Sequence, residues 1–452
     1  MGQRVLLICN YFAPDHAIAA IRTTKLAKYL RQSGYEVEVF AERKDGGEDE
    51  LLKEDAEGIK ITYAENSPGY IRFRELYEKF IGPHKKKRFD NLDNRKRMNP
   101  KTGNIEFYTF EAAYPLIGSL DYIVDQLKQI DLFRSIKKQL KTETHFDYVI
   151  TSYGDFFSYF AGRYFHKYHK GTAWIFDIRD AVYRYKFTPD YVSFIPKKYE
   201  KYIWKHADCI TGISKGICRG VPKKYWKKVH CLTNGFDLSD RRNIKKERKN
   251  ISEMVFTYTG SMYGGIRDLS VLFQAVRELV RDGQISEERI SFHYAGNAPA
   301  YEIFKSQAEA FQLGNRCVMH GKLLRRESLE LQQNSDVLLV ASYDYKDHEG
   351  GVITGKVYEY MAAERPVISV MSGDIEHSEL SQIVEKTKIG VAYEASNHEE
   401  DYGKLCEYIK RQYQAFVETG QTVYEPDKKE LRKYDYRYLC KRLIKIMSQY
   451  HG

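Results

Sequence analysis

The sequence has no hydrophobic run that approaches the roughly 20 apolar residues needed to cross a bilayer. The apolar run near its start, VLLIC at residues 5–9, is too short for the core of a signal peptide. The seven cysteines never form a Cys-x-x-Cys motif, which argues against a disulfide framework or a zinc site. We therefore expect a cytoplasmic protein with reduced thiols.

The residues that are present are typical of a globular protein. Hydrophobic residues make up 42% and charged residues 30%, which excludes global disorder. The 72 Lys and Arg outnumber the 62 Asp and Glu, and the net charge of +10 favours an anionic partner such as phosphates, nucleic acid or acidic lipid headgroups. A length of 452 residues favours two large domains.

Strand-like and helix-like segments alternate along both halves of the chain. Apolar, β-prone segments predict strands at residues 4–12, 35–41, 146–153, 172–180, 207–214, 227–237, 254–260, 290–296, 317–321, 336–343, 366–371 and 389–395. Helical spacing is found at residues 23–34, 156–169, 268–283, 300–312, 326–333 and 355–364. Such alternation predicts an α/β protein in which each half is a doubly wound, Rossmann-like domain with a parallel sheet.

The polar, charged segment that follows Asp237 is the best candidate for a linker. We place one domain at residues 1–240, the linker at 241–252 and the second domain at 253–428. The tail at 429–452 is amphipathic at helical spacing. It is predicted to form a helix that crosses back onto the first domain.

Residues from about 66 to 120 interrupt the alternation and are interpreted as an insertion. The segment contains the basic run Lys85–Arg88 and a second basic cluster at residues 95–97. A solvated charged face, a nucleic-acid patch and a dock for anionic membrane are the three interpretations, and the solvated, partly packed face is favoured. The aromatic neighbours that suit a membrane interface are Tyr70, Phe73, Tyr77, Phe80 and Phe89.

The segment TGKVYEYMAAERPV at residues 354–367 carries the strongest chemical signal. Thr354 and Gly355 form a small-residue turn that opens a helix, so free backbone N–H groups and the positive helix end can face a diphosphate. Lys356 adds a full positive charge. Glu359 lies three residues later on the same face, where its carboxylate can accept both hydroxyls of a ribose. A surface ion pair is the plainer interpretation of these two residues alone.

This segment resembles the donor-site helix of family 4 glycosyltransferases, whose retaining enzymes have the GT-B fold. The resemblance implies two Rossmann-like domains that face each other across a cleft, with the nucleotide-sugar in the second. Many relatives have a glutamate eight residues before the second one, and that position is Gly351 here. Glu349 or His348 is the candidate to contact the sugar instead.

A second segment that matches the family runs from strand to glycine-rich loop to helix at residues 256–268. The loop includes Gly260, Ser261 and Gly264, and glycines allow the close backbone approach that a phosphate needs. By resemblance, Arg267 stabilises the leaving phosphate. A plain strand–helix turn is the alternative. Further glycine turns at the ends of strands match in sequence order and include Gly296, His320 and Gly321.

The first domain supplies the acceptor residues in this prediction. Asp15 and His16 follow the first strand, and Arg22 lies at the start of the next helix. Relatives often have a Gly-Gly pair here, where this chain has Ala19 and Ala20, so close approach to a ligand is less assured. Asp180, at the end of a strand, is the candidate that orients or deprotonates an acceptor hydroxyl. A capping or paired carboxylate is the alternative for Asp180.

No Asp-x-Asp motif occurs in the sequence, so we expect no metal and no cofactor beyond a UDP- or GDP-sugar donor. Arg267, Lys356 and the helix start would stabilise the leaving diphosphate instead. The resemblance implies a retaining hexosyltransferase that acts on a saccharide or lipid-linked acceptor in bacterial surface polysaccharide synthesis, in the cytoplasm or peripherally at the inner face of the membrane. The rivals are a nucleotide-sugar epimerase of the same fold and a non-catalytic basic nucleic-acid or scaffold protein.

Overall fold

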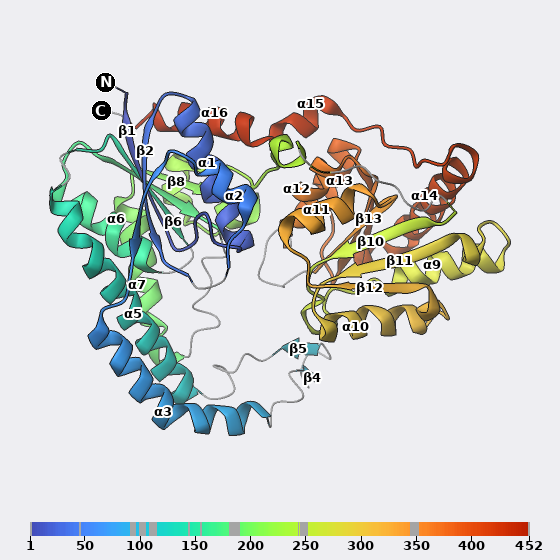
Figure 1. Ribbon diagram of the computed structural model, residues 1–452, viewed down its shortest axis with the longest axis horizontal. Coiled ribbons are helices and arrows are strands. Elements are labelled where there is room, and N and C mark those ends of the chain that lie inside the picture. The colour runs from blue at the N-terminus through green and yellow to red at the C-terminus, as the bar shows by residue number, and fades with distance from the viewer. Residues whose placement is uncertain are drawn as a thin grey trace.

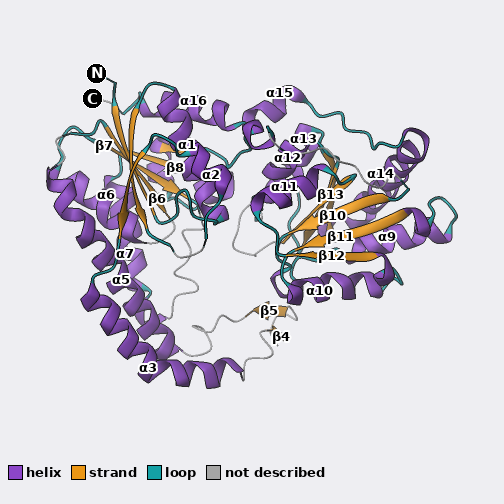
Figure 2. Ribbon diagram, viewed as in Figure 1, coloured by secondary structure: helices purple, strands orange, loops and turns teal. Residues whose placement is uncertain are grey.

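The protein forms two parallel sheets flanked by helices (Figures 1 and 2). The structure is a computed structural model that describes residues 2–44, 47–90, 96–98, 105–107, 115–142, 145–153, 156–179, 190–242, 244, 252–343 and 352–450. None of the helices in these ranges is both long enough and apolar enough to cross a membrane. The predicted α/β class with two doubly wound sheets is confirmed.

The first sheet has seven strands in the order β3-β2-β1-β6-β7-β8-β9, all paired in parallel. Their bounds are β1 Arg4–Cys9, β2 Glu36–Glu42, β3 Lys60–Ala64, β6 Tyr148–Tyr153, β7 Ala173–Ile178, β8 Cys209–Gly212 and β9 Val229–Cys231. Every residue of β6 and β7 is buried, as expected for strands covered on both faces. The strand order reverses between β1 and β6, which places a ligand-binding crevice at their carboxyl ends.

The second sheet has six parallel strands in the order β12-β11-β10-β13-β14-β15. Their bounds are β10 Met254–Thr259, β11 Ile290–Ala295, β12 Cys317–Gly321, β13 Val337–Tyr343, β14 Val367–Ser372 and β15 Gly390–Glu394. The order reverses between β10 and β13, so this sheet repeats the architecture of the first. Each predicted strand of this half has a counterpart in the structure.

Helices cover both faces of each sheet. In the first half they are α1 Ile18–Gln32, α2 Glu50–Asp55, α3 Pro68–Asp90, α5 Pro115–Thr142, α6 Phe156–Tyr168, α7 Phe194–His206 and α8 Lys215–Arg219. In the second half they are α9 Ser270–Arg281, α10 Ala298–Glu309, α11 Arg325–Gln333, α12 Lys356–Ala363, α13 Glu379–Thr387 and α14 His398–Thr419. Helices α13 and α14 were not predicted, although α14 buries Leu405, Ile409 and Phe416 at helical spacing.

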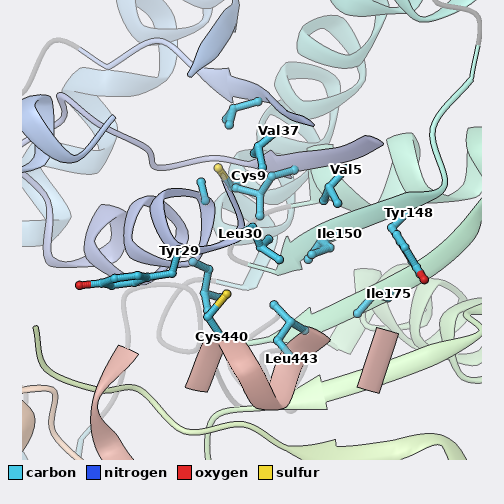
Figure 3. Close-up of a cluster of buried hydrophobic side chains, with 14 of the residues drawn as sticks. Val5, Cys9, Tyr29, Leu30, Val37, Tyr148, Ile150, Ile175, Cys440 and Leu443 are labelled. Atoms are coloured by element: carbon cyan, nitrogen blue, oxygen red, sulfur yellow. The ribbon is translucent and has the colours of Figure 1, made fainter. Parts of the chain in front are cut away.

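The chain ends in α15 Lys428–Leu431 and α16 Tyr436–Met447, which return to the first sheet (Figure 1). Cys440 and Leu443 of α16 pack with Leu30 of α1 and with Val5 and Ile150 of the first sheet (Figure 3). The predicted C-terminal helix that crosses back is therefore confirmed. Its amphipathic face is buried in the core of the first domain.

The predicted insertion contains helices that the sequence analysis did not anticipate. Helices α3 and α5 run side by side along the edge of the first domain, and a two-stranded antiparallel pair, β4 Lys96–Met98 with β5 Ile105–Phe107, lies between them in sequence (Figure 1). The basic run Lys85–Arg88 belongs to the last turns of α3. Most of the predicted linker at 241–252 lies outside the described residues.

Candidate functional site

Three strands of the second sheet end in glycine turns that lie side by side. Gly260 follows β10, Gly296 follows β11, and Gly321 ends β12. The Gly260 amide donates to the carbonyl of Ala295 over 2.8 Å, and the Gly296 amide donates to the carbonyl of Gly321 over 2.9 Å. The carboxyl ends of the strands therefore form one hydrogen-bonded rim, at the edge where open α/β sheets bind ligands.

The turns at Gly260 and Gly296 require glycine. Gly260 has a φ of 131°, and a Cβ there would lie 3.6 Å from Cε of Lys356. A Cβ on Gly296 would lie 2.4 Å from Oη of Tyr294 and 2.6 Å from the carbonyl oxygen of Gly260. Lys356 thus lies directly against the Gly260 turn.

Lys356 and Glu359 form an ion pair in the first turn of α12. Their Nζ and Oε2 atoms are 3.0 Å apart, and the side chains are 17% and 15% exposed. The Lys356 amide donates to Oγ1 of Thr354 over 3.4 Å, and Gly355 is the residue before the helix. The Val357 and Tyr358 amides donate to the carbonyls of Thr354 and Gly355 over 3.4 and 3.2 Å, so this helix end contributes a partial positive charge beside the Lys356 ammonium.

The carboxylate of Glu359 is held ionised by its neighbours. Burial acts to raise the pKa of Glu359, but Lys356 and Arg325 outweigh it and lower that pKa below its ordinary value. Nε2 of Gln332 also donates to Oε2 of Glu359 over 3.3 Å. An ionised carboxylate only accepts hydrogen bonds, so Glu359 suits a pair of hydroxyl donors.

Arg325 is a cation beside this pair that the sequence analysis missed. Its Nη2 donates to Oδ2 of Asp240 in the first half of the chain over 2.6 Å, whereas Nε and Nη1 have no hydrogen-bond partner among the described residues. Arg325 opens α11 shortly after the Gly321 turn. An arginine in the first turn of a helix opposes the helix dipole, and that unfavourable placement is the sequence signal that could have identified it.

A pocket of about 140 Å³ lies at this point and is lined by residues of both domains. Its lining comes from His16, Ala17, Ile18, Ile21 and Asp49 of the first domain and from Leu323, Arg325, Ser328, Lys356 and Glu359 of the second. A Cβ on Gly355 would lie 3.9 Å from Cγ2 of Ile18, so the start of α12 faces the start of α1. The predicted acceptor residue His16 therefore lines the same pocket as the predicted donor residues Lys356 and Glu359.

Arg267 contacts residues of the glycine-rich loop itself in this structure. Its Nη1 donates to the carbonyl of Ser261 over 3.0 Å, its guanidinium lies 4.3 Å from the ring centroid of Tyr263, and only 8% of the residue is exposed. Gly264 in the same loop has a φ of 65°. Its Nε has no hydrogen-bond partner among the described residues, and the predicted contact with a leaving phosphate stays a prediction.

Arg22 is engaged inside the first domain rather than presented to the pocket. It is 2% exposed, and its Nε and Nη2 donate to both oxygens of Asp177 over 3.0 and 2.8 Å. The carbonyl oxygens of Leu232 and Thr233 accept from the same guanidinium over 2.9 and 2.7 Å. Because its donors are already satisfied, an acceptor contact at Arg22 has no support in this geometry.

Asp15 and His320 lie at the two sides of the site. Oδ2 of Asp15 has no hydrogen-bond partner among the described residues, and burial raises the pKa of that carboxyl. Nε2 of His320 lies 3.1 Å from Nδ1 of His293. Burial, with the nearby His320, lowers the pKa of His293 to about 4. The predicted residues Asp180 and Glu349 lie outside the described residues, as does Gly351.

Three carboxylates elsewhere surround a lysine. Oxygens of Asp55, Asp237 and Asp240 lie within 4.8 Å of one another, the one grouping of metal-ligand type among the described residues. The ammonium of Lys25, which is fully buried, pairs with Asp55 over 2.5 Å, with Asp237 over 2.9 Å and with Asp240. The position that a cation would take is therefore filled by Lys25.

Comparison with known proteins agrees with this architecture. Residues 253–409 match the family model for Glycosyl transferases group 1, while no curated protein matches the sequence. Sucrose-phosphate synthase from Thermosynechococcus elongatus is 14% identical with a TM-score of 0.58, over 99% of this chain and 98% of that one. The lipopolysaccharide outer core galactosyltransferase WaaB is 13% identical with a TM-score of 0.54, over 99% of both chains.

A trehalose-6-phosphate structure from E. coli with UDP-2-fluoro glucose bound is 10% identical, with a TM-score of 0.58 over 99% of both chains. At such identities the structural likeness establishes a shared fold. The matched segment spans β10 to α14 and so includes the glycine rim and the Lys356–Glu359 pair. The group 1 match and the two facing sheets together identify this chain as a glycosyltransferase with the GT-B fold.

Proposed function

We propose that the protein transfers a hexose, with retention of configuration and without a metal ion, from a UDP- or GDP-sugar to a saccharide or lipid-linked acceptor. The observation that carries the proposal is the convergence of Lys356, Glu359 and Arg325 on one pocket against the Gly260 turn. Lys356, Arg325 and a helix N-terminus suit the diphosphate of a nucleotide, and the ionised Glu359 suits its ribose. The proposed retention of anomeric configuration rests on the resemblance to family 4 glycosyltransferases.

The electrostatics of the pocket suit a departing diphosphate. When the bond to the sugar breaks, negative charge develops on the leaving phosphate, and fixed cations and N–H groups stabilise it most effectively when they are already oriented. Lys356 would turn from Glu359 to the phosphate, and the N-terminal end of α12 would add its partial positive charge. Arg325 would add a second charge through Nη1, which has no hydrogen-bond partner among the described residues, and through Nε, which lies 3.9 Å from Oδ2 of Asp49.

Glu359 would then hold the nucleotide by its ribose. Released from Lys356, the carboxylate can accept from two neighbouring hydroxyls, and such charge-assisted hydrogen bonds are roughly twice as strong as neutral ones. Gln332 holds Glu359 in place from α11. The Gly260 loop, with Ser261, Gly264 and Arg267, would cover the diphosphate from the other side.

The sequence and the side chains of the described residues support a reaction that needs no metal ion. The sequence has no Asp-x-Asp motif. Among the residues that the structure describes, the grouping of three carboxylates is occupied by Lys25. Lys356 and Arg325 of the donor pocket would supply the positive charge that a metal ion supplies in other enzymes.

The acceptor would approach from the first domain. His16 lines the pocket, and Asp15 precedes it with one carboxylate oxygen unpartnered. We propose that Asp180 orients the acceptor hydroxyl and that the hydroxyl attacks from the face that the leaving group departs, which retains configuration. Bacterial surface polysaccharide synthesis is the proposed setting.

The decisive test is a thermal-shift panel of UDP-, GDP- and ADP-sugars on the wild type, Lys356→Ala and Glu359→Ala. One nucleotide class should stabilise the wild type, because a ligand that binds only the folded state raises the unfolding free energy. Both variants should lose that stabilisation. Unchanged stabilisation in the variants would overturn the site assignment, and none in the wild type would favour a non-catalytic scaffold.

Turnover assays separate the remaining alternatives. Consumption of the donor without acceptor, with release of an epimerised nucleotide-sugar, would indicate an epimerase. The anomeric configuration of the product, read by NMR, tests retention. Full activity in EDTA tests metal independence.

A further inference from the structure

Helix α5 presents a continuous apolar stripe to solvent. Leu116, Leu120, Ile123 and Leu127 are 73%, 44%, 40% and 43% exposed. Their spacing of four, three and four residues places them on one face of the helix. Isolated exposed leucines are ordinary, but four in one line on a helix need an explanation.

Helix α3 carries a matching stripe. Phe73, Leu76 and Phe80 are 42%, 57% and 68% exposed and also share one helix face. The two stripes together are called the hairpin face below. None of its side chains belongs to a buried core cluster of the first domain, so the core does not account for the stripes.

The two stripes point to the same side. Tyr70 and Tyr77 of α3 donate to the carbonyl of Val124 over 3.2 Å and to Oδ1 of Asp121 over 2.8 Å, so the two helices run antiparallel. Because successive residues of an α-helix are rotated by about 100° around its axis, each stripe lies about a quarter turn around its helix from the line of contact between α3 and α5. In an antiparallel pair these quarter turns lead to the same side, which makes the hairpin face one surface.

Positive charge flanks the hairpin face. Helix α3 contains seven Lys and Arg against three Asp and Glu. Arg72 and Lys79 are exposed on the side of α3 next to the stripe. Apolar side chains between basic ones are the pattern of helices that lie in the interface of an anionic membrane.

We propose that the hairpin face docks the protein on a membrane surface that contains anionic lipid headgroups. A second copy of the chain fits the face less well, because a symmetric contact would bring two basic helices together. The docking deepens the proposed function and rests on it for its purpose, since a lipid-linked acceptor lies in that surface. Figure 1 shows α3 and α5 on the first, acceptor-side domain, with α3 extending toward the second.

Sedimentation with phosphatidylcholine vesicles, with and without phosphatidylglycerol, tests the proposal on the full chain. The wild type should pellet only with the anionic vesicles, and less as salt rises. Leu120→Gln/Ile123→Gln/Leu127→Gln and Phe73→Ser/Leu76→Ser/Phe80→Ser should each bind about tenfold more weakly or worse, because the apolar area that inserts is lost. Arg72→Gln/Lys79→Gln should weaken binding and reduce its salt dependence.

The matched control is Val318→Gln/Val417→Gln, which removes two similarly exposed apolar side chains from the second domain and should pellet like the wild type. Unchanged thermal midpoints show that all variants fold. Equal binding to neutral vesicles, or equal binding by the stripe variants, would overturn the proposal. So would a dimer that the stripe variants convert to a monomer, which would make the face a contact between copies. Nucleotide-sugar stabilisation, measured on the same variants, reports the proposed function separately from docking.

Discussion

Each half of the molecule contains an ion pair, and the two pairs differ in how far they are buried and in what surrounds them. Lys356 and Glu359 lie three residues apart in one helix turn, are 17% and 15% exposed, and line the interdomain pocket. Arg22 and Asp177 lie 155 residues apart, are 2% and 4% exposed, and share their remaining hydrogen bonds with backbone and hydroxyl groups of the first domain. The first pair can exchange its partner for a ligand, and the second cannot.

This contrast shows how to separate a binding pair from a structural one. A carboxylate and a cation beside a pocket gain new hydrogen bonds when a phosphate and a ribose arrive. A saturated buried pair would have to give up several hydrogen bonds and leave charges unpaired, which is costly. Four predictions test the contrast.

The largest effect is expected when the buried pair is broken. Arg22→Ala leaves Asp177 buried without its cation and should lower the unfolding free energy by about 3–5 kcal/mol. Urea denaturation measures the loss. The double variant Arg22→Met/Asp177→Leu should recover much of it, because no uncompensated charge remains. A stability within error of the wild type in Arg22→Ala would show that the guanidinium is not structural.

Breaking the Lys356–Glu359 pair should affect catalysis strongly and stability little. Lys356→Ala should lower kcat by about 10²–10³-fold, as expected for removal of one group that stabilises transition-state charge. Its unfolding free energy should change by less than about 1 kcal/mol, since the pair is partly exposed. The matched control Lys305→Ala breaks an exposed pair with Glu309 in the same domain and should leave kcat unchanged. Equal kcat in the two variants would remove Lys356 from the mechanism.

Substitution of Arg325 is expected to affect both ligand binding and stability, to degrees that lie between those of the two ion pairs. Its Nη2 binds Asp240, which makes it structural, while Nε lies 3.9 Å from Oδ2 of Asp49 and Nη1 has no hydrogen-bond partner among the described residues. Arg325→Gln should weaken nucleoside diphosphate binding by about 10–100-fold, the value of one charged hydrogen bond, and destabilise the fold less than Arg22→Ala. Calorimetric titration gives the affinity. The neighbouring Arg326→Gln serves as control, and equal affinities in both variants would contradict the assignment.

The last prediction concerns the rim of the second sheet. Burial, with the nearby His320, holds the pKa of His293 at about 4, below its ordinary 6.5. The unfolded chain therefore binds a proton that the folded protein does not, and stability should fall as pH decreases from about 6.5 to about 4. In His293→Gln this part of the pH dependence should be absent. Identical pH–stability curves would show that folding does not lower the pKa of His293.

The donor residues were predictable because their arrangement is local. A helix places Lys356 and Glu359 on one face through its own period, and the preceding Thr354 and Gly355 mark where that helix begins. The glycine turns were predictable for a similar reason, since each directly follows a strand. The roles assigned to these residues remain proposals that the variants above test.

The partners of these residues were not predictable in the same way. Arg325 reaches Asp240 across 85 residues, and only the approach of the two domains joins them. Arg22 carries the charge expected of a ligand contact, yet its position on α1 turns it toward Asp177 at the end of β7. Charge alone does not say whether a side chain faces a pocket or the core.

The amino-acid pattern by itself determined the alternation of strands and helices, the two-sheet class and the amphipathic C-terminal helix, because apolar periodicity acts within each segment. Tertiary structure decided which charges are saturated and which remain available, since burial and hydrogen-bond partners depend on segments far apart in the chain. It also decided that the apolar residues of α3 and α5 form one exposed face, because only an antiparallel pairing turns both stripes to the same side.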